Sequence, residues 1–221
     1  MILFHYLNVF VHTRAYWHGP DSVGIRLAQH CEYTLIVLVI AAVLAFPLGC
    51  LTGHTGRGGP AVSVLAVTAR ALPTFGVLVL LTVLMGIGFL PVAIPLVALA
   101  VPPILLATHV GLRGVDPAVV DAARGVGMRP GQVLLQVEIP AALPSILNGL
   151  RSAAVQIVAT ATIAAYVSFG GLGRYIVDGL SEYDYAQVVG GAVVVALLSI
   201  AVLGLFALVT RFAVSPGIRA R

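Results

Sequence analysis

The chain has 221 residues, of which 60% are hydrophobic and only 9% are charged, and its mean hydropathy is +1.07. About one quarter of the residues in a soluble domain are charged, so this composition excludes a soluble domain and indicates an integral membrane protein. All twelve basic residues are arginine. The absence of lysine excludes a P-loop ATPase and a Schiff-base enzyme. The net charge of +4 comes from scattered arginines and gives no reason to expect nucleic acid as a partner.

The first part of the chain, residues 1–30, interleaves aromatic residues with histidine and arginine. It lacks the basic start of a signal peptide, and its apolar run is short. We expect an extracytoplasmic segment that lies at the membrane interface, with its aromatic rings at headgroup level. The alternative is a disordered tail.

Five apolar runs follow and define a transmembrane domain over residues 31–212, before a cytoplasmic tail at 213–221. The first run has 21 residues, which gives about 32 Å of helix and is enough to cross a bilayer. The predicted fold is therefore an all-α integral membrane protein, a bundle of about five transmembrane helices. The runs are 33–53, 61–85, 91–112, 141–167 and 186–210.

Prolines are expected to interrupt two of these spans, and two cysteines lie in or beside the first. Pro73 and Arg70 interrupt the second run, and Pro95, Pro102 and Pro103 predict kinks or a break in the third. Cys31 and Cys50 are too far apart for a CxxC motif, so buried free thiols are expected and no metal site.

A polar loop, residues 113–140, separates the third and fourth runs. Asp116 is a suitable N-cap, Pro117 suits the first helical position, and Gly125 and Gly127 predict the end of this short helix. A second short helix is predicted over residues 131–137, before two prolines start the next apolar run. Two short helices joined by glycines would project into the aqueous phase.

Within this loop the spacing of small and charged residues is specific. Asp121, Ala122 and Ala123 are followed after three residues by Gly127 and, nine residues later, by Val137, Ile139 and Pro140. The alanines allow a partner to approach closely, and the glycine permits backbone angles that a side chain would forbid. We interpret the loop as a docking surface; the alternative is an ordinary connection between two spans.

This pattern resembles the EAA loop of ABC importer permeases, with Asp121 in place of Glu, Val137 in place of Ile and Ile139 in place of Leu. Further segments resemble the osmoprotectant branch of the type I importers, which carries glycine betaine, choline or carnitine. These segments are 46–49, 71–74, 111–117, 159–165 and 170–173. Methionine permeases also have a glycine-rich turn after this span, so a methionine-type or other small-solute importer is the alternative.

The resemblance implies a division of labour. The chain would be the permease subunit, with no catalytic residue and no cofactor of its own. Its partners would be a cytoplasmic ATPase dimer that binds ATP and Mg²⁺, a second permease subunit (identical or homologous) and an extracytoplasmic binding protein. The residues expected to couple it to the ATPase are Asp116, Asp121, Ala122, Ala123, Gly127, Val137, Ile139 and Pro140.

The arginines predict the orientation in a bacterial inner or plasma membrane. With the docking loop in the cytoplasm, seven arginines lie inside, against three outside. An odd number of spans then places the N-terminus outside and the C-terminus in the cytoplasm. The inner set is Arg57, Arg113, Arg124, Arg129, Arg211, Arg219 and Arg221, and the outer set is Arg14, Arg26 and Arg174.

Polar residues inside the spans are candidates for the translocation path. Arg70 either lines the path or, as we favour, extends to lipid phosphates. The fourth span is the most polar, and its side chains either line a route for a solute or bond to neighbouring helices. The candidates there are Gln156, Thr160, Thr162 and Tyr166.

Three further features lie near the boundaries of the spans. Arg151 is expected to pair with Glu138 close to the docking loop, whereas His109 is equally consistent with a contact to that loop and with an interior position. A flexible outer turn is predicted at Gly170, Gly171 and Gly173.

Two other classes of protein are disfavoured. A secondary transporter or channel usually carries intramembrane carboxylates, but Glu32 and Glu138 both lie at boundaries. A membrane enzyme needs a catalytic constellation, and the six histidines are dispersed.

Overall fold

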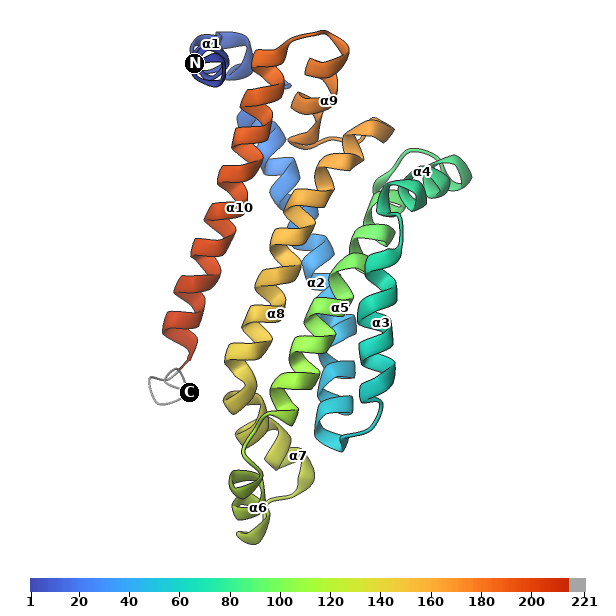
Figure 1. Ribbon diagram of the computed structural model, residues 1–221, viewed down its shortest axis with the longest axis vertical. Helices are drawn as coiled ribbons and strands as arrows, with labels where there is room; N and C mark the ends of the chain where they lie inside the picture. The colour runs from blue at the N-terminus through green and yellow to red at the C-terminus, as the bar shows by residue number, and fades with distance from the viewer. Residues whose placement is uncertain (215–221) are drawn as a thin grey trace. The chain divides into compact units, whose positions relative to one another are not determined.

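The computed structural model describes residues 1–214, except for the side chain of Arg70, and every element in that part of the chain is helical (Figure 1). The predicted tail at 213–221 lies almost entirely outside the described residues. The α-helices are α1 (Ile2–His12), α2 (Val23–Thr55), α3 (Gly59–Ala71), α4 (Thr74–Met85), α5 (Phe89–Arg113), α6 (Pro117–Gly125), α7 (Pro130–Val133), α8 (Ile139–Thr160), α9 (Gly173–Ser181) and α10 (Tyr185–Ala213). Two 3₁₀ segments, η1 (Arg14–Tyr16) and η3 (Ala161–Val167), and one π-helical turn, η2 (Leu134–Glu138), lie between them.

Among the described residues, four helical stretches are long and apolar enough to cross a membrane, and the broken pair α3–α4 makes a fifth if it counts as one span. The four are α2, α5, the run Pro130–Val167 and α10. The prediction of an all-α bundle with about five spans is therefore confirmed. The break falls at Leu72 and Pro73, as the proline predicted.

Two boundaries differ from the prediction. Helix α2 begins at Val23 rather than at residue 33, because residues 23–32 contain no helix breaker other than Gly24. Helix α5 is continuous, so a break in the third span is wrong. Pro102 and Pro103 are buried, and packing around them offsets the backbone hydrogen bonds that they cannot donate.

The chain forms two compact units. Unit 1 contains Met1–Val37, Pro73–Val97 and Ala154–Val202; unit 2 contains Leu38–Leu72, Ala98–Ala153 and the described residues from Leu203 onward. The four longest helices each contribute one end to each unit.

Unit 2 is held together by glycines at which helices approach closely. A Cβ on Gly49 would lie 2.6 Å from Thr108 Cβ, and one on Gly149 would lie 2.5 Å from Ala107 Cβ. Small residues permit such contacts between helices in lipid, where no hydrophobic driving force brings the helices together. Ser145 Oγ adds a hydrogen bond of 2.8 Å to the carbonyl oxygen of Ala107. An apolar cluster of Cys50, Leu112, Ala142 and Ile146 fills the space beside these contacts.

Unit 1 has an aromatic centre formed by Phe10, Tyr16 and Tyr175. The Tyr175 hydroxyl lies 2.8 Å from the carbonyl oxygen of Asp21, and Tyr16 donates a hydrogen bond to the Asp184 carboxylate. Burial, together with this bond to Asp184, raises the pKa of Tyr16 far above its ordinary value. These contacts attach the N-terminal segment, which is helical over Ile2–His12 and not a disordered tail.

Helix α9 was not predicted from the sequence. It lies between the fourth and fifth predicted runs and carries Arg174 and Asp178, which form an ion pair of 2.8 Å. The signal that identifies α9 is apolar residues at helical spacing, with Tyr175 and Gly179 on the buried side.

Both cysteines are free thiols. Cys50 is buried, as expected, whereas Cys31 is exposed, which corrects the expectation for that residue.

Candidate coupling loop and transport path

The first helix of the candidate coupling loop, α6, begins as the sequence predicts. The Asp116 carboxylate accepts a hydrogen bond of 2.9 Å from the backbone N–H of Ala118, and Pro117 occupies the first helical position. The chain reverses after Gly125, where the N–H of Val126 donates to the carbonyl oxygen of Ala122 at 3.1 Å. Gly127 then adopts a φ of +88°, which is the left-handed conformation that favours glycine.

The second part of the loop differs from the prediction of a separate helix over residues 131–137. Helix α7 ends at Val133 and continues through the π-helical turn η2 directly into α8. Pro140 has no N–H for an α-helical bond to the carbonyl group four residues before it. The wider π-helical turn lies immediately before this proline and accommodates the missing bond. Figure 1 shows α6 and α7 beyond the ends of α5 and α8.

The motif residues separate into exposed and packed groups. Asp121, Ala122 and Gly127 are exposed, whereas Ala123 is buried. Ile139 packs against the apolar cluster of unit 2. The first half of the motif therefore forms a surface, and the isoleucine of the second half anchors the loop to the bundle.

Two exposed apolar side chains extend this surface. Val126 is 81% exposed and Leu135 is 66% exposed, although both belong to a loop that projects from the spans. Apolar residues grouped on an exposed surface are typical of a contact with a partner. The motif does not include Val126 and Leu135. The sequence indicates them only as apolar residues inside a polar segment.

The structure gives Glu138 a partner other than the predicted Arg151. Glu138 is 5% exposed, and its Oε2 lies 2.6 Å from Nδ1 of His54, in the last turn of α2. Arg151 is exposed and lies on α8, more than three turns beyond Glu138. His109 Nδ1 lies 3.1 Å from Thr52 Oγ1, so it contacts α2 and not the coupling loop.

The candidate path residues of the fourth span lie on α8 and η3. Gln156 and Thr160 are partly buried, and Thr162 donates a hydrogen bond of 2.8 Å to the carbonyl oxygen of Ala159. Tyr166 is 57% exposed, and its ring meets that of Phe75 edge to face, with centroids 5.4 Å apart. The sequence analysis missed Phe75, since an aromatic residue in an apolar run carries no separate signal. The side chain of Arg70 lies outside the described part of the structure.

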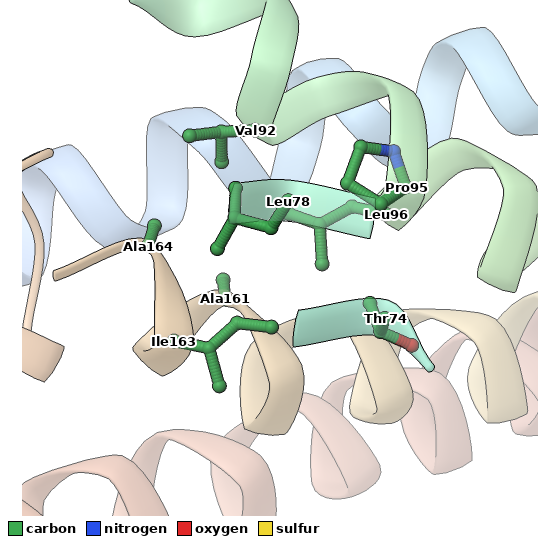
Figure 2. Close-up of a pocket in the computed structure, with 8 residues that line it drawn as sticks. All are labelled: Thr74, Leu78, Val92, Pro95, Leu96, Ala161, Ile163 and Ala164. Atoms are coloured by element: carbon green, nitrogen blue, oxygen red, sulfur yellow. The ribbon is translucent and has the colours of Figure 1, made fainter. Parts of the chain in front are cut away.

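A pocket in unit 1 lies beside these residues but does not suit a solute. Figure 2 shows side chains of α4, α5 and η3 converging on it, and nearly all are aliphatic. It leaves no room for a water molecule. Thr74 supplies the one side-chain oxygen in the lining, so the pocket offers almost no polar contact to a solute. We interpret it as a packing defect next to η3.

The outer glycine turn is closely packed, which corrects the interpretation of a flexible turn. A Cβ on Gly173 would lie 2.1 Å from the carbonyl oxygen of Thr162, and one on Gly170 would lie 2.6 Å from Gln29 Oε1. Gly171 has a φ of +92°, and its N–H donates to Gln29 Oε1 at 3.1 Å. The glycines are required here for close approach, so the turn is held in place.

His30 fixes the same turn and was not singled out from the sequence. It is 1% exposed, and its Nδ1 accepts a hydrogen bond of 3.3 Å from the N–H of Leu172. Its Nε2 lies 2.9 Å from the carbonyl oxygen of Val158. Both ring nitrogens are therefore used in joining α2 to the end of the fourth span.

The long apolar helices and the two-helix loop are the features of an integral membrane protein. The family model for the inner membrane component of binding-protein-dependent transport systems matches residues 45–220. The chain belongs to this family, which consists of transport subunits that are not themselves enzymes.

Curated relatives cover most of the chain. The choline transport system permease protein OpuBB of Bacillus subtilis is 31% identical over 90% of this chain and 89% of its own length. The glycine betaine/carnitine/choline permease OpuCB of the same organism is 33% identical, over 79% of this chain and 81% of its own length. The carnitine permease OpuCB of Listeria monocytogenes is 34% identical, with 80% and 82% covered.

Solved structures show the same fold. An inward-facing form of the MetNI methionine ABC transporter has a TM-score of 0.75 at 21% identity and covers 87% of this chain and 96% of its own. An amino acid ABC transporter has a TM-score of 0.68 at 18% identity, with 95% and 96% covered. The fold is that of a type I ABC importer permease.

Proposed function

We propose that this chain is the membrane permease of an ATP-driven importer for an osmoprotectant such as glycine betaine, choline or carnitine. The observation that carries the proposal is the coupling loop, where the capped helix α6 exposes Asp121 and Ala122 and the turn after it exposes Gly127. The names of the relatives support the class of solute.

The chain has no lysine for a P-loop, so its energy has to come from a partner. A dimer of cytoplasmic ATPases, which binds ATP and Mg²⁺, supplies it through the loop at residues 116–140. A second permease subunit completes the path, and an extracytoplasmic binding protein delivers the solute. Closure of the ATPases moves the loop, and the helices attached to it turn as rigid bodies between outward-open and inward-open states.

Solute passes along the polar face of the fourth span. Gln156, Thr160, Thr162 and Tyr166 supply an amide and hydroxyl groups there, and no cofactor is needed in this chain.

The proposed orientation of the chain has the N-terminus outside and the C-terminus in the cytoplasm.

The test is ATP hydrolysis by the reconstituted complex with binding protein, loaded or not loaded with glycine betaine or choline. Stimulation by the loaded binding protein is the expected result. Assembly without stimulation by either compound, but with stimulation by methionine-loaded protein, would overturn the class of solute. Failure to assemble with any ATPase would overturn the proposed function.

A further inference from the structure

One buried, charged contact joins the end of α2 to the start of α8 in unit 2. The Glu138 carboxylate is almost fully buried, and the side chain of His54 is 19% exposed. The distance of 2.6 Å between Nδ1 and Oε2 is that of a short hydrogen bond to a charged acceptor, in which the imidazole N–H donates. Among the described residues, His54 is the ion-pair partner of Glu138.

The residue next to Glu138 has apolar surroundings. Ile139 packs against the cluster of Cys50, Leu112, Ala142 and Ile146. An apolar contact can slide without losing much of its energy, but a buried carboxylate that loses its partner is strongly destabilised. Separating Glu138 from His54 would therefore be costly.

Both residues lie at joints of the chain. Glu138 is the last residue of the π-helical turn that connects the coupling helix α7 to α8. His54 precedes a linker in which Gly56 and Gly58 have φ angles of +69° and +84°. Such glycines can change their backbone angles at little cost, so the linker from α2 to α3 can follow a displacement of His54.

We propose that Glu138 and His54 are positioning residues that carry the displacement of the coupling loop to α2 and the α2–α3 linker. The ATPase moves α6 and α7, η2 transmits this movement to Glu138, and the hydrogen bond transmits it to His54. The second span therefore changes position together with the fourth. The pair has this role only if the chain is the importer permease proposed above.

The experiment compares the assembled complex carrying His54→Ala, Glu138→Ala, or both, with the wild type. Glu32→Gln is the matched control, because Glu32 is an exposed carboxylate of α2 with no ion pair among the described residues. The quantities measured are ATP hydrolysis per complex, with and without loaded binding protein, and solute taken up per ATP hydrolysed. The ratio of uptake to hydrolysis is the decisive measurement, since a merely structural role would lower the amount of complex and leave this ratio unchanged.

Each single variant is expected to lose at least tenfold in uptake per ATP. The double variant should lose no more than either single variant, because the two residues act as a unit. Uptake per ATP equal to that of the wild type in the single variants would overturn the proposal. A double variant whose loss equals the product of the two single losses would overturn it as well. If the alanine variants do not assemble, Glu138→Leu, which is close to glutamate in size but has no hydrogen-bond acceptor, decides: coupling equal to the wild type would refute the role. A wild-type complex without stimulation by binding protein would instead count against the proposed function.

Discussion

Single glycines have distinct roles in this molecule, and the space around each one identifies its role. Gly127 has a positive φ and no heavy atom within 4 Å of the place that a Cβ would take, whereas Gly149 has an ordinary φ and a neighbouring helix against it. The first glycine is required by the backbone and leaves its surface open to a partner. The second is required by the packing of α8 against α5.

Replacing Gly127 with leucine is expected to leave the protein inserted but to abolish uptake, because the side chain occupies the docking surface. A leucine at this positive φ costs about 1–2 kcal/mol, and Gly19→Leu is the control, since Gly19 also has a positive φ, +100°, and no heavy atom within 4 Å of the place that a Cβ would take. Binding of the ATPase is measured for both. Equal binding by the two variants would contradict a docking role for Gly127.

Replacing Gly149 with alanine is expected to lower the thermal stability of the purified protein. The new methyl group would lie 2.5 Å from Ala107 Cβ and 2.8 Å from the carbonyl oxygen of Pro103. Overpacking of this kind costs about 1–3 kcal/mol. Gly204→Ala in α10, where nothing lies within 4 Å, is the control and should be neutral or slightly stabilising. A lower stability of the control would indicate that α10 is packed there.

At the scale of elements, the π-helical turn η2 sets the rotation of the coupling helices about the axis of α8. Each residue of a helix turns the chain by about 100°. Val133 is fully buried before this turn and Glu138 is buried at its end, so both sides of the turn are fixed to the bundle. The length of the turn is therefore constrained more than its sequence.

Deleting Gln136, an exposed residue of this turn, is expected to rotate α7 by about 100° relative to α8 and to prevent assembly with the ATPase. Insertion into the membrane should be unaffected, because α8 itself is unchanged. Gln136→Ala keeps the number of residues and serves as the control. Co-purification of the ATPase with each variant measures the effect, and normal assembly of the deletion variant would show that the rotation does not matter.

At the scale of the whole molecule, the topology depends on the broken pair α3–α4. If the pair crosses the membrane, there are five spans and the ends lie on opposite sides; if it does not, there are four spans and the ends lie on the same side. The five apolar runs predict five spans, and the arginine distribution predicts that the N-terminus is outside.

Reporter proteins fused to each end test this arrangement. Green fluorescent protein at the C-terminus is expected to fluoresce, and alkaline phosphatase at the N-terminus is expected to be active. If alkaline phosphatase is active at the C-terminus and green fluorescent protein there does not fluoresce, the orientation is the reverse of the predicted one. Two ends on the cytoplasmic side would mean that α3 and α4 form a re-entrant segment.

The sequence was sufficient for the features that depend on local chemistry. Hydropathy identified the spans, Asp116 and Pro117 identified the start of α6, and Pro73 identified the break in the second span. It was not sufficient where a tertiary contact decides. The partner of Glu138 lies on a helix 84 residues away, and the nearer Arg151 has the more obvious charge. The close packing at Gly173 likewise depends on Thr162, and nothing in the run of glycines distinguishes such packing from flexibility.

The unequal exposure of the two cysteines provides a reporter that needs no engineering. Cys31 is exposed on α2, whereas Cys50 is covered by the helices that surround it in unit 2. The rate at which a small maleimide modifies Cys50, relative to Cys31, therefore measures how often those helices separate. Followed during ATP turnover, this ratio would reveal whether transport opens the interior of unit 2 or moves it intact.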